Sequence, residues 1–352
     1  MVSDPNAPLQ HPLGEGGDPA PPIHAPAWAL AQRQWAAGAP LPWLHQEVAR
    51  RMADRLSVIR VQPSVILEWD ALAGQSRPAL QVAVPAAQWV PVAPTRAALE
   101  RIHSGGYPNP SQPPQPPQHL QPQPTGLLGQ LARIGSRARG LFTPGREATP
   151  APAAQPRAAQ GFLDAEVPAG HGQLLWSNLG LHTHARPADV LRRWHAALAV
   201  DGFLMFSTFG PDTLQQWRGL WESAAWGPPA QPFRDMHDWG DDLVAAGFAD
   251  PVMDQETVTL TWASPAEALA ELRTMGRNAH PGRYSGCRTP RWRARLEAAV
   301  EQAAGPDGRV ALGFEIIYGH AFRPVPRSRL QATTTVSLDD MRHMVKTPRR
   351  PR

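Results

Sequence analysis

The sequence has almost no cysteine or lysine. Cys287 is the single cysteine in 352 residues, which excludes an internal disulfide and a multi-thiolate zinc site and fits a reducing compartment. Lysine occurs once, at Lys346, so arginine supplies the basic charge and reflects coding bias more than phosphate recognition. No early basic-then-apolar segment is present, and no run reaches the roughly 20 apolar residues that span a bilayer. We therefore expect a soluble, cytoplasmic protein without a transmembrane segment.

Charge is spread unevenly along the chain. The formal net charge is +4, but residues 101–160 hold six arginines and one acid, and residues 323–352 hold eight basic residues and two acids. These two segments carry +5 and +6, which leaves −7 for the rest of the chain. A mildly acidic globular part with basic flexible segments gives no reason to expect nucleic acid as the partner.

Proline marks the expected boundaries. Residues 1–42 contain nine prolines and no sustained period, so we expect them to be disordered. Residues 104–160 contain twelve prolines and many glutamines, and such a segment buries too little apolar surface to offset its ordering entropy. It is interpreted as a flexible insert, and residues 323–352 as a basic, disordered tail. Residues 43–103 and 161–322 remain as the two parts of one folded domain.

Within the insert, residues 127–142 place five leucine and isoleucine side chains near three arginines. They are interpreted either as a short amphipathic helix for a partner or an anionic surface, or as a transient helix without a partner.

Residues 173–214 predict a strand, a helix and a second strand. Leu174–Trp176 is a short apolar run, apolar residues then recur at helical spacing, and Phe203–Phe206 is apolar again. A buried helix between two apolar strands implies a right-handed crossover in a parallel sheet. Ligands of such sheets bind beyond the carboxyl ends of the strands, which here carry Trp176–Asn178 and Ser207–Phe209.

Other elements follow from periodicity and capping signals. We expect a first strand at Ser64–Trp69 and a second around Trp89–Val92, where Pro91 favours an edge position. The remaining predictions are a helix at 43–56, strands at 248–253 and 257–262, a late antiparallel strand at 309–322, and helices capped by Asp235 or Asp238, by Ser264 and by Thr289.

Five stretches in the second half of the chain carry a family resemblance. WSNL at 176–179 and DGFLMFSTFGPDTL at 201–214 are followed by matching stretches at 233–238, 247–254 and 272–279. In this order they resemble class I S-adenosylmethionine (SAM) methyltransferases, and more narrowly the malonyl-acyl-carrier-protein O-methyltransferase family of biotin biosynthesis. The resemblance covers the second half of the chain well and the first hundred residues poorly.

This resemblance implies an α/β fold with a Rossmann-like, mostly parallel sheet, helices on both faces and a disordered Pro/Gln-rich insert. The implied activity is SAM-dependent methylation of the free carboxylate of a malonyl thioester, with malonyl-acyl carrier protein or malonyl-CoA as partner. The insert falls near the family's third strand, so part of the usual sheet is expected to be missing. The helix at 43–56 either covers the active site, as in the family, or packs on the sheet.

The cofactor turn departs from the family pattern of an acid followed by a Gly-x-Gly-x-Gly-like turn. Glu68 matches the acid and Gly74 the last glycine, but Asp70 and Leu72 stand at the two other glycine positions. Each adds a side chain where the cofactor's amino-acid moiety lies, and Asp70 adds charge. The acid that the family places after its second strand is also missing, since no carboxylate follows before Glu100.

Three further residues are implied for the cofactor edge. Asp164 matches an aspartate near adenine, with an exposed loop acid as the alternative. Asn178 offers an amide, and Trp176 offers either a wall of the site or a core side chain. His182 and His184 lie on one side of an extended segment without a third ligand, so no metal site is predicted.

Arg273, Arg277 and Tyr284 lie in the segment that resembles the family's substrate cover. An arginine there either binds the malonyl carboxylate or the acidic carrier protein, or is simply solvated. No catalytic residue is predicted, because a carboxylate is already ionised at neutral pH and needs no base.

The degenerate turn keeps a second function open: a non-catalytic, methyltransferase-like binding or scaffold protein that has lost tight SAM binding. A weaker third possibility is a nucleic-acid or membrane adaptor that works through the basic insert.

Overall fold

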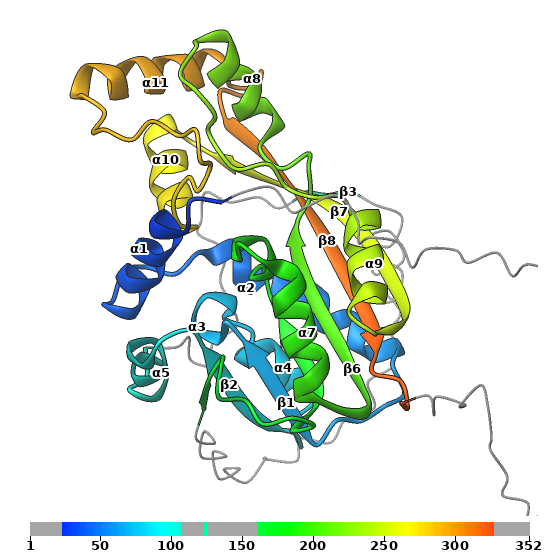
Figure 1. Ribbon diagram of the computed structural model, residues 1–352. Coiled ribbons are helices and arrows are strands. Elements are labelled where there is room, and N and C mark those ends of the chain that lie inside the picture. Colours follow the sequence, from blue (N-terminus) through cyan, green and yellow to red (C-terminus); the bar gives the residue numbers. More distant parts are fainter. Residues whose placement is uncertain (1–22, 107–122, 126–160, 327–352) are drawn as a thin grey trace, which may run out of the picture.

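The computed structural model describes residues 23–106, 123–125 and 161–326 (Figure 1). The expected amphipathic helix at 127–142, most of the insert and nearly all of the basic tail lie outside the described residues. Within the described part of the chain, no helix is long and apolar enough to cross a membrane.

The described strands form one sheet in the order β3-β7-β8-β6-β5-β1-β2-β4. Their bounds are β1 Val65–Trp69, β2 Gln88–Ala93, β3 Gln123–Thr125, β4 Phe162–Leu163, β5 Gly172–Ser177, β6 Leu198–Phe209, β7 Ala249–Trp262 and β8 Val310–Phe322.

The strand order confirms the predicted α/β architecture. Strands β4, β2, β1, β5 and β6 are parallel neighbours, which is the 3-2-1-4-5 order of a doubly wound sheet. β8 then pairs antiparallel with β6, and β7 antiparallel with β8. The order reverses between β1 and β5, so the ligand crevice is expected beyond the carboxyl ends of these two strands.

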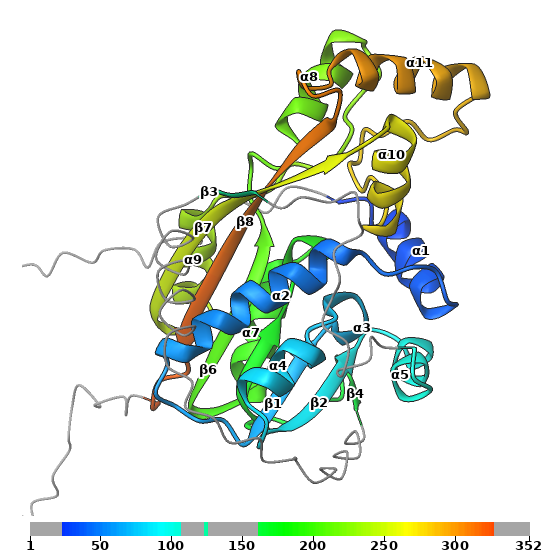
Figure 2. The same ribbon diagram turned by 180° about the vertical axis from the view of Figure 1, so that it is seen from behind.

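Helices cover both faces of the sheet. Figures 1 and 2 show α7 and α9 on one face and α2 and α4 on the other. The helices are α1 Ala25–Ala36, α2 Trp43–Arg55, α3 Ala71–Gly74, α4 Arg77–Ala83, α5 Arg96–His103, α7 Pro187–Ala197, α8 Gln215–Ser223, α9 Met236–Ala245, α10 Pro265–Thr274 and α11 Pro290–Gln302, with 3₁₀ turns at Leu56–Val58 and Leu181–Thr183.

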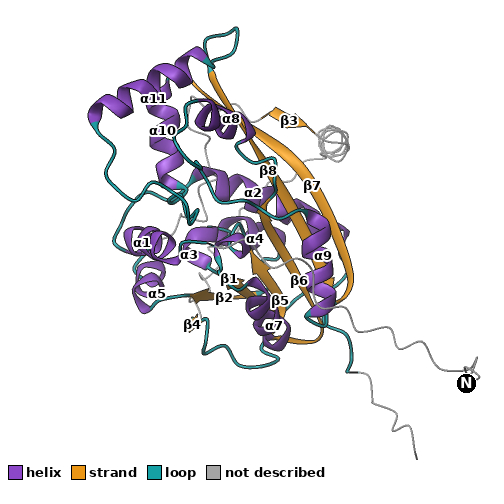
Figure 3. Cartoon of the chain, turned by 45° about the horizontal axis from the view of Figure 1, so that its top comes forward, coloured by secondary structure: helices purple, strands orange, loops and turns teal. Residues whose placement is uncertain are grey.

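Each face has its own core. Under α7 and α9, buried side chains such as Leu191, Trp194 and Leu243 pack on the sheet. The other core lies under α2 and α4 and continues into α8, α10 and α11, which gather at one end of the sheet beside α1 (Figure 3). Burial of this apolar surface is the main favourable term that holds the layers together.

Capping residues begin the helices where the sequence predicts. Asp235, rather than Asp238, caps α9 by accepting from the backbone N–H groups of His237 and Asp238. The Ser264 hydroxyl accepts from Glu267 N at the start of α10, and Thr289 caps α11 in the same way. These bonds satisfy backbone donors that have no partner inside a helix.

The sequence predicts that residues 1–42 are disordered, but part of this segment is helical. Ala25–Ala36 form α1, which buries Ala27, Ala31 and Trp35 along one face. The spacing i, i+4 and i+8 of these residues is helical, but alanine is too weakly apolar for the pattern to stand out.

The insert and the late strands also differ from expectation. Residues 123–125, inside the predicted flexible insert, form β3 and pair antiparallel with β7. The two strands predicted at 248–253 and 257–262 are one continuous strand, β7, because β8 pairs with it through the polar residues between them.

The family's third strand is short rather than missing. β4 has two residues and pairs with Val92 and Ala93 of β2. At Pro91, β2 pairs with β1 on one side, and its pairing with β4 on the other side begins one residue later. Pro91 therefore lies in an edge-like position, which a proline requires because it has no backbone N–H to donate.

Candidate functional site

Glu68 lies near the carboxyl end of β1 and is fully buried. Its Oε1 accepts a hydrogen bond from Ser76 N at 2.8 Å, and its Oε2 accepts one from the Trp89 indole at 2.7 Å. Both carboxylate oxygens therefore hold the turn after β1 against α4 and β2. The residue that matches the family's acid stabilises the turn from beneath.

Asn178 joins the ends of β1 and β5. Its side-chain amide donates to the carbonyl oxygens of Gly74 and His45, each at 2.7 Å, and its Oδ1 accepts from the Ser207 hydroxyl at 2.7 Å. A side chain at Gly74 would be crowded, because a Cβ would lie 3.2 Å from Glu68 Oε1 and 3.6 Å from Asn178 Cβ. The hydrogen bonds of Asn178 thus span the crevice between the two strands.

The first turn of α2 closes over the same place. His45 Nδ1 lies 2.7 Å from the Ala73 carbonyl, and burial lowers the pKa of His45 to about 4, so its neutral ring donates this bond. Gln75 donates to the Pro42 carbonyl at 2.8 Å and accepts from the Gln46 amide at 2.7 Å. Side chains of α2 therefore bond the turn, and a side chain of the turn bonds the start of α2.

Asp70 adopts a left-handed backbone conformation, with φ of 53°, at the first substituted glycine position. Such a conformation is what a glycine favours, and aspartate tolerates it at some cost. Its carboxylate is nearly buried and lies 3.0 Å from His184 Nε2. The extra side chain is thus held by a histidine that follows β5.

In this conformation the turn differs from the family's SAM-binding turn in its side chains and in the partners of its polar groups. The polar groups of Glu68, Gln75 and Asn178 are already bonded to protein atoms, and a carboxylate stands where the family has glycine. β2 ends at Ala93 without the acid that would hold the ribose hydroxyls. Ser177 is an exception, since its buried hydroxyl has no partner among the described residues.

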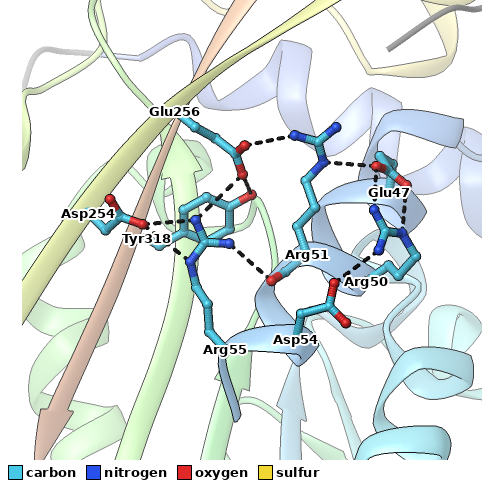
Figure 4. A network of polar contacts seen from close by, with 8 residues as sticks. All are labelled: Glu47, Arg50, Arg51, Asp54, Arg55, Asp254, Glu256 and Tyr318. Atoms are coloured by element: carbon cyan, nitrogen blue, oxygen red, sulfur yellow. Dashed lines mark hydrogen bonds and ion pairs between the residues drawn. The ribbon is translucent and has the colours of Figure 1, made fainter. Parts of the chain in front are cut away.

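The far end of α2 is fixed to β7 and β8 by an ionic network (Figure 4). Arg51 bonds Glu47 at 2.8 Å and Glu256 at 2.7 Å, and the Tyr318 hydroxyl donates to Glu256 at 2.8 Å. The Arg55 guanidinium lies 3.7 Å above the centre of the Tyr318 ring. Burial acts to raise the pKa of Glu47, but hydrogen bonds and charge from Arg50 and Arg51 outweigh it, and the net shift is downward.

Asp164 follows β4 and stands apart from this group. Its Oδ2 accepts from Arg193 of α7 at 2.9 Å. A broad, open depression of about 640 Å³ runs along α7 from His184 to Arg193 and Ala196. Its arginines are balanced by acids, because Arg186 and Arg192 pair with Asp189 while Arg193 pairs with Asp164.

The carboxyl end of β6 is lined by aromatic rings. His182 lies between Phe209, Phe233 and Trp28, at ring-centre distances of 4.8, 5.5 and 6.4 Å. Burial, followed by electrostatic interaction with His45 and His184, lowers the pKa of His182 to about 3, so the ring is neutral at physiological pH. Among the described residues, no cluster of three or more metal-binding side chains forms.

Arg273 and Arg277 lie together at the junction of α1 and α10. Arg273 lines a cavity of about 190 Å³ there, and Arg277 donates to Gln34 of α1 at 3.2 Å. Tyr284 lies in a different cluster, under the Arg288 guanidinium at 4.0 Å, beside Trp292 and Trp226. The structure therefore brings the two arginines together but not the tyrosine.

The structure groups Glu68, Gly74 and Asn178 at one edge, while Trp176 is fully buried in the core beneath them. The sequence interpretation missed the His45 and Gln75 contacts and the pairing of Asp70 with His184. The available signal was the polar run Gln75–Ser76 directly after an apolar strand and turn, since buried polar groups need partners. Nothing local to the sequence indicates which helix supplies those partners.

Comparison with known proteins places the chain beside one set of curated relatives. It is 34% identical over 306 residues to the malonyl-[acyl-carrier protein] O-methyltransferase of Laribacter hongkongensis, covering 86% of this chain and 88% of that protein. It is 33% identical over 282 residues to the protein of that name from Halorhodospira halophila, covering 79% and 81% of the two chains. No family model matches the chain.

The solved structures that the chain matches have low sequence identity to it and TM-scores below 0.5. The YcgJ protein from Bacillus subtilis covers 80% of this chain and 99% of its own, at 10% identity and a TM-score of 0.44. A putative methyltransferase from Bacillus halodurans covers 78% and 99%, at 12% identity and a TM-score of 0.42. The sheet order described above is that of a class I methyltransferase-like, Rossmann-like fold.

Proposed function

Because the chain belongs to the malonyl-[acyl-carrier protein] O-methyltransferase family, we propose that it methylates the free carboxylate of a malonyl thioester with SAM as donor. The acyl group is carried by acyl carrier protein or coenzyme A. The observation that supports this proposal is the 34% identity that extends over 86% of the chain, beyond the motifs of its second half.

The proposed reaction needs no catalytic side chain to activate the acceptor. A malonyl carboxylate is ionised at neutral pH and needs no general base, so the protein's task is to hold it in line with the donor and to exclude water. His182, neutral between aromatic rings, and the buried Ser207 and Thr208 line the end of β6 where an acceptor would lie.

Calorimetric titration of the full chain with SAM tests the donor. We expect binding with a dissociation constant in the micromolar to millimolar range, weaker in Asp164→Ala if that carboxylate contacts adenine. Absence of heat at millimolar SAM would remove SAM-dependent methyl transfer as the function. Unchanged affinity in Asp164→Ala would remove Asp164 alone from the site.

A second candidate is favoured by the closed turn. A protein in which Asn178, Gln75 and His45 bond the crevice shut can bind a malonyl thioester without methylating it. Transfer of a labelled methyl group from SAM to malonyl-CoA separates the two candidates. Malonyl-CoA binding without any transfer would leave the binding protein as the remaining function.

A further inference from the structure

A cavity of about 190 Å³ lies between α1 and α10. By volume it corresponds to about six water molecules, which suits a short acyl group rather than a nucleotide. It is lined by small apolar side chains and an indole, with one guanidinium: Ala31, Gln34, Trp35, Ala39, Pro40, Ala270, Arg273, Thr274 and Gly276.

Several contacts fix the walls of this cavity. The Trp35 indole donates to the Thr274 carbonyl at 3.0 Å, and Arg277 donates to Gln34 at 3.2 Å. Gly276 has a φ of 114°, and a Cβ there would lie 2.8 Å from the Trp28 ring. The two helices are therefore held at a set separation, and a ligand would find the cavity formed.

Arg273 is the charged group that this cavity offers to a ligand. Its side chain is exposed, and among the described residues it has no ion-pair partner. No carboxylate is among the described residues that line the cavity. This differs from the depression along α7, where Arg186, Arg192 and Arg193 all face acids. An anionic group would thus meet an unneutralised guanidinium at α10.

The cavity lies close to the turn after β1. Pro40 in its lining is two residues before Pro42, whose carbonyl accepts from Gln75 of that turn at 2.8 Å. Two residues of extended chain span at most about 7 Å. Helix α1 also contacts α3 of the turn directly.

We propose that this cavity holds the acyl group of a short acyl thioester whose terminal carboxylate binds the Arg273 guanidinium. The identity of the acyl group as malonyl rests on the proposed function. The apolar lining accommodates the methylene and the thioester, and Arg273 selects acyl groups that end in a carboxylate over those that end in a methyl group.

Calorimetric titration of the full chain with malonyl-CoA and with acetyl-CoA, both without SAM, tests the proposal. The two probes differ in the terminal carboxylate alone. The wild-type chain is expected to bind malonyl-CoA at least about tenfold more tightly, the usual size of a charge-assisted hydrogen bond. Arg273→Gln removes this preference while the acetyl-CoA affinity stays within about twofold, and Arg273→Lys retains part of it.

Arg33→Gln is the matched control, because Arg33 is an exposed arginine of α1 that does not line the cavity. It is expected to keep the full preference for malonyl-CoA. Equal binding of the two probes by the wild type, or equal effects of Arg33→Gln and Arg273→Gln, would overturn the proposal. A chain that prefers malonyl-CoA but gives no heat with SAM loses the methyl-transfer function and keeps this cavity. A chain that transfers the methyl group but binds malonyl-CoA and acetyl-CoA equally keeps the methyl-transfer function and loses this cavity as the acyl site.

Discussion

Polar side chains have different partners in two regions of the molecule: the carboxyl ends of β1 and β5, and the junction of α1 with α10. At the strand ends, Asn178 and Gln75 are buried and bonded to the protein's own carbonyl and amide groups. At the helix junction a cavity stays open, and the exposed Arg273 has no acidic partner in the described part of the chain. The proposed donor site has its polar groups bonded to other protein groups, whereas the proposed acceptor cavity presents an arginine that has no ion-pair partner among the described residues.

Removing the amide of Asn178 is expected to give the largest effect on this comparison. Asn178→Leu removes three buried hydrogen bonds, to the carbonyls of Gly74 and His45 and from the Ser207 hydroxyl, which costs about 3–5 kcal/mol of unfolding free energy. The matched change on the acceptor side is Asn278→Leu, which loses bonds to Pro228 O and His280 N in a partly exposed loop.

We expect about 1 kcal/mol for Asn278→Leu. Denaturant unfolding followed by circular dichroism measures both variants. Equal losses would show that the strand ends are no more tightly bonded than the outer loop.

Acid is expected to weaken the closed turn next. The pKa of His45 is lowered to about 4 by burial, against 6.5 for an unfolded chain. Between these values the unfolded chain takes up a proton that the folded one does not, so stability falls as pH falls from 6.5 to 4. The contribution of His45 is about 3 kcal/mol.

Thermal unfolding of the wild type and of His45→Gln at several pH values measures this contribution. A glutamine amide still donates to the Ala73 carbonyl but does not titrate, so the variant should lose less stability on acidification. Parallel pH profiles for the two proteins would contradict the role of His45.

The smallest of the three effects concerns the anchor of α2. Arg51 is 11% exposed and bonds Glu47 and Glu256, whereas neighbouring Arg50 is 49% exposed. Arg51→Ala removes one partner from each of two nearly buried carboxylates, Glu47 and Glu256, and should cost about 2 kcal/mol, while Arg50→Ala should cost less than about 0.5 kcal/mol. The denaturation midpoints of the two variants test this, and similar midpoints would rule out a distinct anchor.

Much of the fold could be predicted from sequence because its signals are local. The strand–helix–strand unit from Leu174 to Phe206 and the caps at Ser264 and Thr289 need no distant information. The family resemblance added the parallel sheet. β3 and α1 escaped prediction because their stability depends on β7 and on α10, which lie more than a hundred residues away.

The site was less predictable for the same reason. That Asp70 replaces a glycine is visible in the sequence, but its pairing with His184 joins residues 114 positions apart. Asn178 was assigned to the cofactor edge from its motif, and its three bonds to the protein's own groups appear only once α2 and β6 are in place. The cofactor and substrate roles of the individual residues remain predictions.

Helix α2 connects the turn after β1 to strands β7 and β8. It is about 20 Å long. The turn after β1 is bonded to its beginning, and side chains of β7 and β8 contact Arg51 and Arg55 near its end. Because Arg51 and Arg55 bond the end of the helix to β7, a movement of the helix that keeps these bonds is a rotation about these two residues. A tilt of about ten degrees there would move the Pro42 end by roughly 3 Å, the length of the hydrogen bonds that keep the crevice shut.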